Sequence, residues 1–133
     1  MNLDKVGRAI VALVATMLML IGLAYLLIPI DVLSLAGQFT LDGDALIDVR
    51  ATYGGFQVGL GLFLFVQIFR RENIVFSLQL LTVIFISVGG VRFVGALVGV
   101  DVSYAHMVAA LAEIASAAAC LFLSTSIIAK ESP

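Results

Sequence analysis

The sequence predicts an all-α integral membrane protein, a bundle of four helices that cross the bilayer. Of its 133 residues, 62% are hydrophobic and only 12% are charged, and the mean hydropathy is +1.20. Soluble domains are about half apolar and a quarter charged. A soluble chain this short could not bury so much apolar surface in one core, so lipid must solvate most of it.

The first expected span covers residues 9–30 and contains no charged residue. This is about the ~20 residues that a helix needs to cross the hydrocarbon core. A cleaved signal peptide is the alternative, because Lys5 and Arg8 precede the apolar run and small residues follow at 34–36. Its apolar region is longer than the roughly 7–15 residues of a signal sequence, so we expect the span to be retained.

Three further apolar runs predict spans at 51–69, 74–98 and 104–129, all within a single domain. Backbone groups cannot stay unpaired in lipid, so these segments must be helices. Strands of a membrane β-barrel would be shorter and would alternate in polarity. The two short turns predict that the second, third and fourth spans are sequential antiparallel neighbours.

The connection between the first two spans is the longest, at about twenty residues, and it is acidic. It carries Asp31, Asp42, Asp44 and Asp48, together with Gly37 and Gly43. We expect this segment to be a loop that folds partly onto the membrane surface.

The basic residues predict the orientation, because cytoplasmic segments carry an excess of Lys and Arg. The N-terminus, the second connection and the C-terminus hold Lys5, Arg8, Arg70, Arg71 and Lys130. Both termini are therefore expected on the cytoplasmic side. Tyr25, Tyr53 and Tyr104 then fall at the outer ends of their spans, where aromatic residues form a belt.

Glycines at four-residue spacing indicate close helix packing, since small residues let helices approach in lipid. The second span has Gly55 and Gly59, with Gly54 beside them, and the third has Gly95 and Gly99. These rows either hold one compact bundle together or contact a partner subunit.

Two charged residues inside spans, Arg92 and Glu113, are expected to meet, because intramembrane charges are costly and usually paired. Arg92 lies nine residues before Asp101 and Glu113 lies twelve after it. If the turn centres there, their depths differ by only ~5 Å at 1.5 Å rise per residue. We therefore predict a buried ion pair, which either sets helix register or serves a ligand.

Other polar residues fall at a similar depth. His106 is seven residues before Glu113, on one helix face, and Arg50, Tyr53 and Gln57 follow helical spacing in the second span. Together with Arg92 they could form an outward-facing polar pocket between the second, third and fourth spans. The simpler alternatives are that Arg50 is an interfacial anchor, that Tyr53 belongs to the aromatic belt, and that His106 caps a helix.

Several classes of function lack support. No arrangement of nucleophile, base and orienting group is visible, and no phosphate-binding loop follows a strand. One His, one Cys and one deep Glu do not have the spacing of a metal site. Seven Lys and Arg leave no basic patch for nucleic acid. We therefore expect no catalysis, no metal and no resident cofactor, although a lipid or quinone could bind.

The segment Arg50-Ala51-Thr52-Tyr53-Gly54-Gly55, followed by Gly59-Leu60-Gly61, resembles the bacterial membrane family catalogued as domain of unknown function 4345. The resemblance covers nearly the whole chain. It implies that Arg92, Glu113 and Pro29 belong to the same recurring pattern. The family looks distantly similar to the DoxX-like four-helix membrane proteins, some of which accompany quinone-linked oxidoreductases. That likeness implies a fold and no reaction.

Three functions follow as hypotheses. The first is an accessory subunit that docks on a larger membrane complex, favoured by small size and glycine-rich faces. The second is a protein that binds a small lipophilic, anionic or quinone-like molecule at the polar pocket. The third, a proton-coupled transporter using Glu113, is disfavoured because the first span has no charge and Glu113 has an arginine near it. The expected partners are membrane lipids and other membrane subunits.

Overall fold

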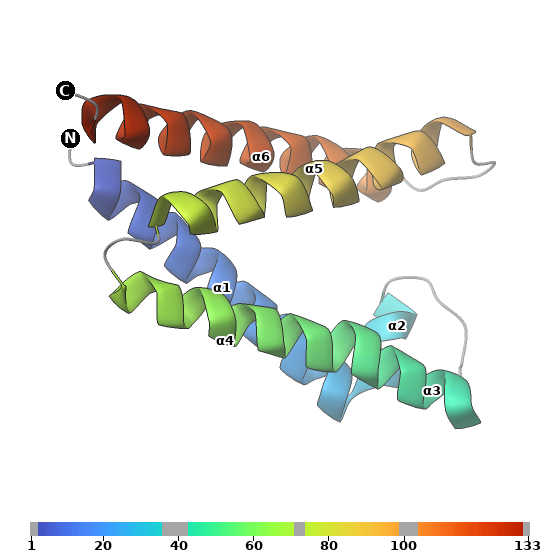
Figure 1. The fold of residues 1–133 in the computed structure, drawn as a ribbon. Helices are drawn as coiled ribbons and strands as arrows, with labels where there is room; N and C mark the ends of the chain where they lie inside the picture. Colours follow the sequence, from blue (N-terminus) through green and yellow to red (C-terminus); the bar gives the residue numbers. More distant parts are fainter. Residues whose placement is uncertain (1–2, 36–42, 71–73, 99–103, 132–133) are drawn as a thin grey trace. The chain divides into compact units, whose positions relative to one another are not determined.

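Helices make up nearly all of the described structure, as the all-α prediction requires. The computed structural model describes residues 3–35, 43–70, 74–98 and 104–131. The elements in order are α1 (Leu3–Leu27), α2 (Pro29–Leu35), α3 (Gly43–Val49), the π-helix η1 (Arg50–Gly55), α4 (Phe56–Phe69), α5 (Ile74–Val98) and α6 (Tyr104–Glu131) (Figure 1).

Four helical segments are long and apolar enough to cross a membrane. They are Leu3–Leu27, Gly43–Phe69, Ile74–Val98 and Tyr104–Lys130. With 25 to 27 residues each, they exceed the ~20 residues that a bilayer requires. The prediction of a multi-pass helical membrane protein is confirmed.

A proline ends α1 earlier than the sequence pattern indicates. The apolar run continues to Ile30, but α1 stops at Leu27 and α2 begins at Pro29. Proline has no backbone N–H, and its ring clashes with the carbonyl four residues earlier. The chain stays hydrogen-bonded on both sides of the break, since the Ile28 amide donates to Ala24 O at 2.8 Å and the Val32 amide to Ile28 O at 3.1 Å.

The predicted acidic loop is largely helical where the structure describes it, which corrects that expectation. It contains α2 and α3, whereas Gly37 and Asp42 lie outside the described residues. The second span begins at Gly43 rather than near Ala51, because α3, η1 and α4 continue one another. Gly43 has φ of +54°, a left-handed conformation that glycine adopts without strain.

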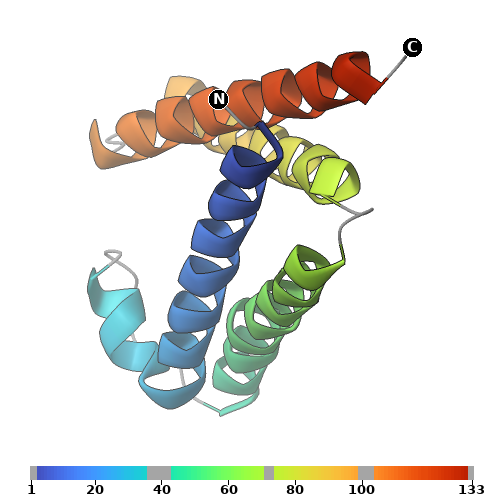
Figure 2. The ribbon, with the colours of Figure 1, turned by 90° about the vertical axis from the view of Figure 1, so that its left-hand side faces the viewer.

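The chain divides into two compact units. We call residues 9–70 the N-terminal unit, and residues 1–8 with 71–133 the C-terminal unit. In the N-terminal unit, α1 and α4 run antiparallel and side by side (Figure 2). Their register is visible at two glycines, because Gly61 lies against Ala15 and Met19 while Gly54 lies against Leu26.

The C-terminal unit is built on the antiparallel pair α5 and α6, which follow each other along their lengths (Figures 1 and 2). Leu78 and Leu81 of α5 are fully buried, as are Ala117 and Cys120 of α6. The first turns of α1 also belong to this unit. There Gly7 lies close to Leu78, Ile74 and Ile127, near the first residues of α5 and the last turn of α6.

Candidate functional site

An ion pair joins α5 to α6. Arg92 Nε donates to Glu113 Oε2 at 3.1 Å, so the structure forms the pair that the helix depths predict. Gly89, one turn before Arg92, makes this approach close. A Cβ at Gly89 would lie 3.0 Å from Glu113 Cβ and 3.2 Å from Ala110 O. The missing side chain therefore lets the two backbones approach where the charges meet.

The pair is half-buried, which corrects the expectation of full burial. The side chain of Arg92 is 35% exposed and that of Glu113 is 20% exposed. A single hydrogen bond connects them, through the guanidinium Nε. Arg92 Nη1 lies 3.5 Å from His106 Nδ1, at the limit of hydrogen-bonding distance. The three side chains thus form one cluster, which we call the Arg92 cluster.

The arginine of this cluster keeps donors to spare. A guanidinium has five N–H groups, of which Glu113 takes one and His106 lies near one more. Among the described residues, none accepts a hydrogen bond from Arg92 Nη2. Glu113 neutralises the charge, and of the terminal fork Nη2 has no acceptor among the described residues while Nη1 has only the 3.5 Å contact with His106. Such a fork suits carboxylate, phosphate or carbonyl oxygens.

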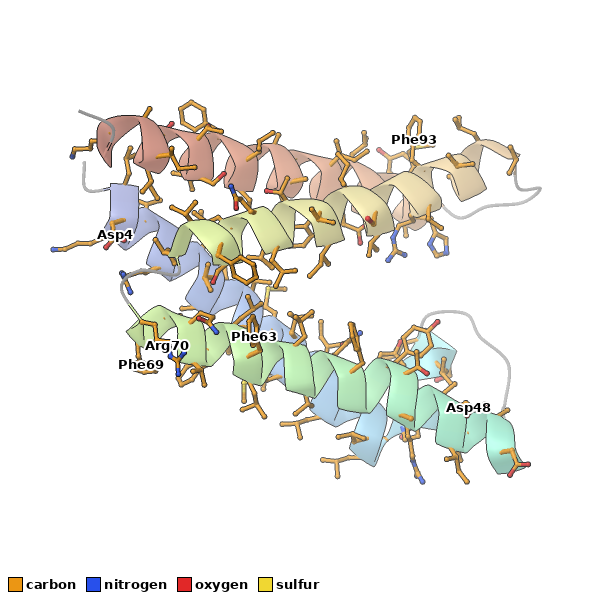
Figure 3. The ribbon with its side chains drawn as sticks, in the orientation of Figure 1. Asp4, Asp48, Phe63, Phe69, Arg70 and Phe93 are labelled. Carbon is orange, nitrogen blue, oxygen red and sulfur yellow. The ribbon has the colours of Figure 1, made fainter. Side chains whose placement is uncertain are left out.

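The other three predicted site residues, Arg50, Tyr53 and Gln57, belong to the N-terminal unit. The ring of Tyr53 packs against Tyr25 of α1, with centroids 5.4 Å apart and planes tilted by 30°. Arg50 is exposed, and within the described part of the chain it forms no ion pair with Asp48. Asp48 is labelled near the end of α3 in Figure 3. Residues two apart on a helix do not face each other, which explains why Asp48 and Arg50 do not pair.

The six predicted site residues therefore separate into two groups, each described within its own unit. Arg92, His106 and Glu113 meet in the C-terminal unit. Tyr53 and Gln57 lie in the N-terminal unit, where η1 meets α4, and Arg50 begins η1. Because the two units are described separately, a single pocket that joins the two groups stays a prediction.

Sequence reasoning missed the π-helix. The segment Arg50–Gly55 forms i to i+5 hydrogen bonds, and the Phe56 amide continues them by donating to Ala51 O. Its wider turn changes which residues share a face before and after it, so the α-helical spacing assumed for Arg50, Tyr53 and Gln57 does not hold. Short π-helical segments are rare and are frequent at functional sites. The Gly54-Gly55 pair, which we interpreted as a packing signal, is the local feature that could have indicated an irregular helix here.

Within the described residues, the predicted packing glycines differ in how closely they pack. Gly54 does pack closely, since a Cβ there would lie 2.7 Å from Leu26. A Cβ at Gly55 would meet only Arg50 O, at 3.9 Å, and at Gly59 and Gly95 no described atom lies within 4 Å. The close contacts run instead through Gly22, Gly54 and Gly61. Gly99 lies outside the described residues.

Four apolar spans, together with a half-buried charge cluster between two of them, define a multi-pass membrane protein with a polar intramembrane site. Residues 6–124 match the family described as Domain of unknown function (DUF4345), so the chain belongs to that family. No curated protein and no solved structure matches the chain.

Proposed function

We propose that this membrane protein binds a small lipophilic molecule with acceptor oxygens, quinone-like or anionic, at the Arg92 cluster. The observation that carries the proposal is the single hydrogen bond between Arg92 Nε and Glu113, because among the described residues the terminal nitrogens of Arg92 then have only the 3.5 Å contact with His106. Arg–carboxylate pairs are frequently bidentate, whereas this pair uses one hydrogen bond.

The roles of the three side chains follow from their chemistry. Glu113 offsets the cost of an arginine inside the membrane and orients it through Nε. Arg92 then donates to the ligand oxygen from its terminal nitrogens. His106 lies 3.5 Å from Arg92 and can donate or accept, according to its tautomer. The proposed role is binding, without catalysis or a resident metal.

The proposal includes an orientation. With Lys5, Arg8, Arg70 and Lys130 on the cytoplasmic side, both termini face the cytoplasm of a bacterial inner membrane. Arg92 is six residues before the end of α5. In this orientation it lies about 9 Å from the outer end of its helix, at 1.5 Å rise per residue. A ligand would then enter from the outer leaflet.

A second candidate function, an accessory subunit of a larger membrane complex, is favoured by one observation. Gly55, the last residue of η1, and Gly59 of α4 are four residues apart and exposed; among the described residues a Cβ at Gly55 would meet only Arg50 O, at 3.9 Å, and a Cβ at Gly59 no atom within 4 Å. Such a row allows another helix to approach closely in lipid. Here the partner would be a helix of another membrane subunit.

One purification separates the two candidates. The native protein is extracted into nanodiscs, and mass spectrometry identifies every bound molecule. We expect a stoichiometric lipophilic ligand, its loss in Arg92→Gln, and its retention in Arg50→Gln, which removes an exposed arginine in the other unit. A stoichiometric protein complex without such a ligand would overturn the first candidate and support the second.

A further inference from the structure

The Arg92 cluster carries no net charge when His106 is neutral. Arg92 contributes one positive charge, and Glu113, whose Oε2 lies 3.1 Å from Arg92 Nε, contributes one negative charge. A lone arginine inside a membrane would attract an anion, but here the carboxylate of Glu113 already fills that role. A second anion on the same guanidinium would be repelled by Glu113, and this repulsion offsets the attraction of Arg92. The charge balance of the cluster therefore favours an uncharged ligand.

Partial burial of the cluster strengthens this preference. Both side chains are half-buried, so a ligand that contacts them gives up part of its own hydration. For a carboxylate or phosphate that loss is large, and only an opposite charge that is not yet neutralised would offset it. A carbonyl group loses far less on the same transfer, and its oxygen accepts a hydrogen bond from a guanidinium N–H.

The other charged residues on this side of the membrane are mostly acidic. In the proposed orientation, the outer side holds one further arginine and five aspartates. These residues are Arg50, Asp31, Asp42, Asp44, Asp48 and Asp101. An acidic surface lowers the local concentration of anions and does not affect neutral molecules in this way. An anionic ligand would therefore be repelled before it reached the cluster.

We propose that the ligand of the Arg92 cluster is an uncharged, membrane-soluble molecule that presents a carbonyl oxygen, as an ester, a ketone or a quinone does. Such a ligand lies within the proposed function, on which its assignment rests, and carboxylates and phosphates are excluded. Arg92 donates to the carbonyl oxygen from a terminal nitrogen, while Glu113 holds the guanidinium through Nε. Glu113 is then a specificity-determining residue, because its charge selects against the anions that a lone arginine would bind.

Two probes with the same alkyl chain distinguish a neutral carbonyl from an anion. 2-Tridecanone carries a methyl group where dodecanoate carries a charged oxygen. Each probe is titrated into the protein in nanodiscs of an ether-linked phosphatidylcholine, which has no carbonyl group, at about pH 9, where the fatty acid is ionised. The rise of the melting temperature with probe concentration gives the dissociation constant. We expect the ketone to bind at least about tenfold more tightly than dodecanoate.

The response that depends on Arg92 is the one that counts. The same titrations of Arg92→Gln give the background from probe dissolved in the lipid. If Arg92→Gln does not fold because Glu113 has lost its partner, the double variant with Glu113→Gln replaces it, since it leaves no unpaired charge.

Glu113→Gln tests the selectivity of the cluster. Glutamine keeps an acceptor for Arg92 Nε and removes the negative charge, so the cluster becomes a cation. We expect the preference for the ketone over dodecanoate to fall by at least about tenfold, because Arg92 then attracts the anion without opposition. Asp4→Asn is the control. It removes a carboxylate from the other described ion pair, Asp4–Arg8, and should leave the preference unchanged.

A repeat in ester-linked phosphatidylcholine identifies the source of the carbonyl group. A loss of the ketone response there would assign the site to the esters of membrane lipids, and an unchanged response would assign it to a free molecule; either result supports a neutral carbonyl ligand. Dodecanoate that binds as tightly as the ketone, or an unchanged preference in Glu113→Gln, would overturn the neutral ligand and leave the proposed function standing. If neither probe gives a response that depends on Arg92, both are overturned.

Discussion

At the scale of single residues, the most informative contact is the one between Arg92 and Glu113. Hydrogen bonds to charged groups contribute about 1.5–3 kcal/mol to stability, while exposed pairs contribute little. This pair lies between those limits, with side chains 35% and 20% exposed. The contribution of this ion pair to the free energy of unfolding therefore decides whether the cluster mainly stabilises the fold or mainly serves to bind a ligand.

A double-mutant cycle measures that free energy. Glu113→Gln and Arg92→Gln should each lower the free energy of unfolding by about 1–2 kcal/mol, because each leaves the other charge without its partner. The double variant should lose less than the sum, which gives a coupling of about 1 kcal/mol in unfolding by SDS in mixed micelles. The i, i+4 pair Asp4–Arg8, at 2.9 Å, is the control and should show no more than about 0.5 kcal/mol. Additive losses at Arg92 and Glu113 would contradict the prediction.

At the scale of elements, glycine decides how α1 and α4 meet. A Cβ at Gly61 would lie 2.6 Å from Met19 Cγ and 2.8 Å from the backbone oxygen of Ala15. The side chain of Met19 can move, but the backbone of α1 cannot do so without separating the helices. Two residues away, a Cβ at Gly59 meets no described atom within 4 Å. Identical residue types on one helix thus have opposite structural roles.

Alanine substitutions at these two glycines form a matched pair. Gly61→Ala should lower the free energy of unfolding by about 1–3 kcal/mol through overpacking. Gly59→Ala should leave it unchanged or raise it by up to about 1 kcal/mol, because alanine favours helix more than glycine does. Thermal unfolding in detergent measures both. A loss at Gly59 as large as at Gly61 would show that the row at Gly55 and Gly59 is already covered.

At the scale of the whole molecule, the proposed orientation sets the side from which a ligand reaches the Arg92 cluster. Labelling of single cysteines tests it in intact cells. In a Cys120→Ser background, Asp44→Cys at the start of α3 should react with a membrane-impermeant maleimide from outside. Lys130→Cys near the end of α6 should react only after the cells are permeabilised. The reverse pattern would place both termini outside and the Arg92 cluster toward the cytoplasm.

Composition and residue order alone determine the class of this protein. Helices are obligatory in lipid, so four long apolar runs predict four membrane-spanning helices without knowledge of their packing. The Arg92–Glu113 pair was predictable for a related reason. A short turn makes α5 and α6 antiparallel, and a constant rise per residue then sets the depth of each charge.

Only the tertiary structure shows how each helix is rotated about its axis and which helix faces are in contact. The π-helix changes the face on which Arg50, Tyr53 and Gln57 lie, and hydropathy does not report hydrogen-bond register. That rotation turns Gly54 and Gly61 toward α1, whereas Gly55 and Gly59 do not contact it. All four glycines occur in one apolar run, and lipid does not distinguish the faces of that helix, so the sequence alone does not tell which of them pack.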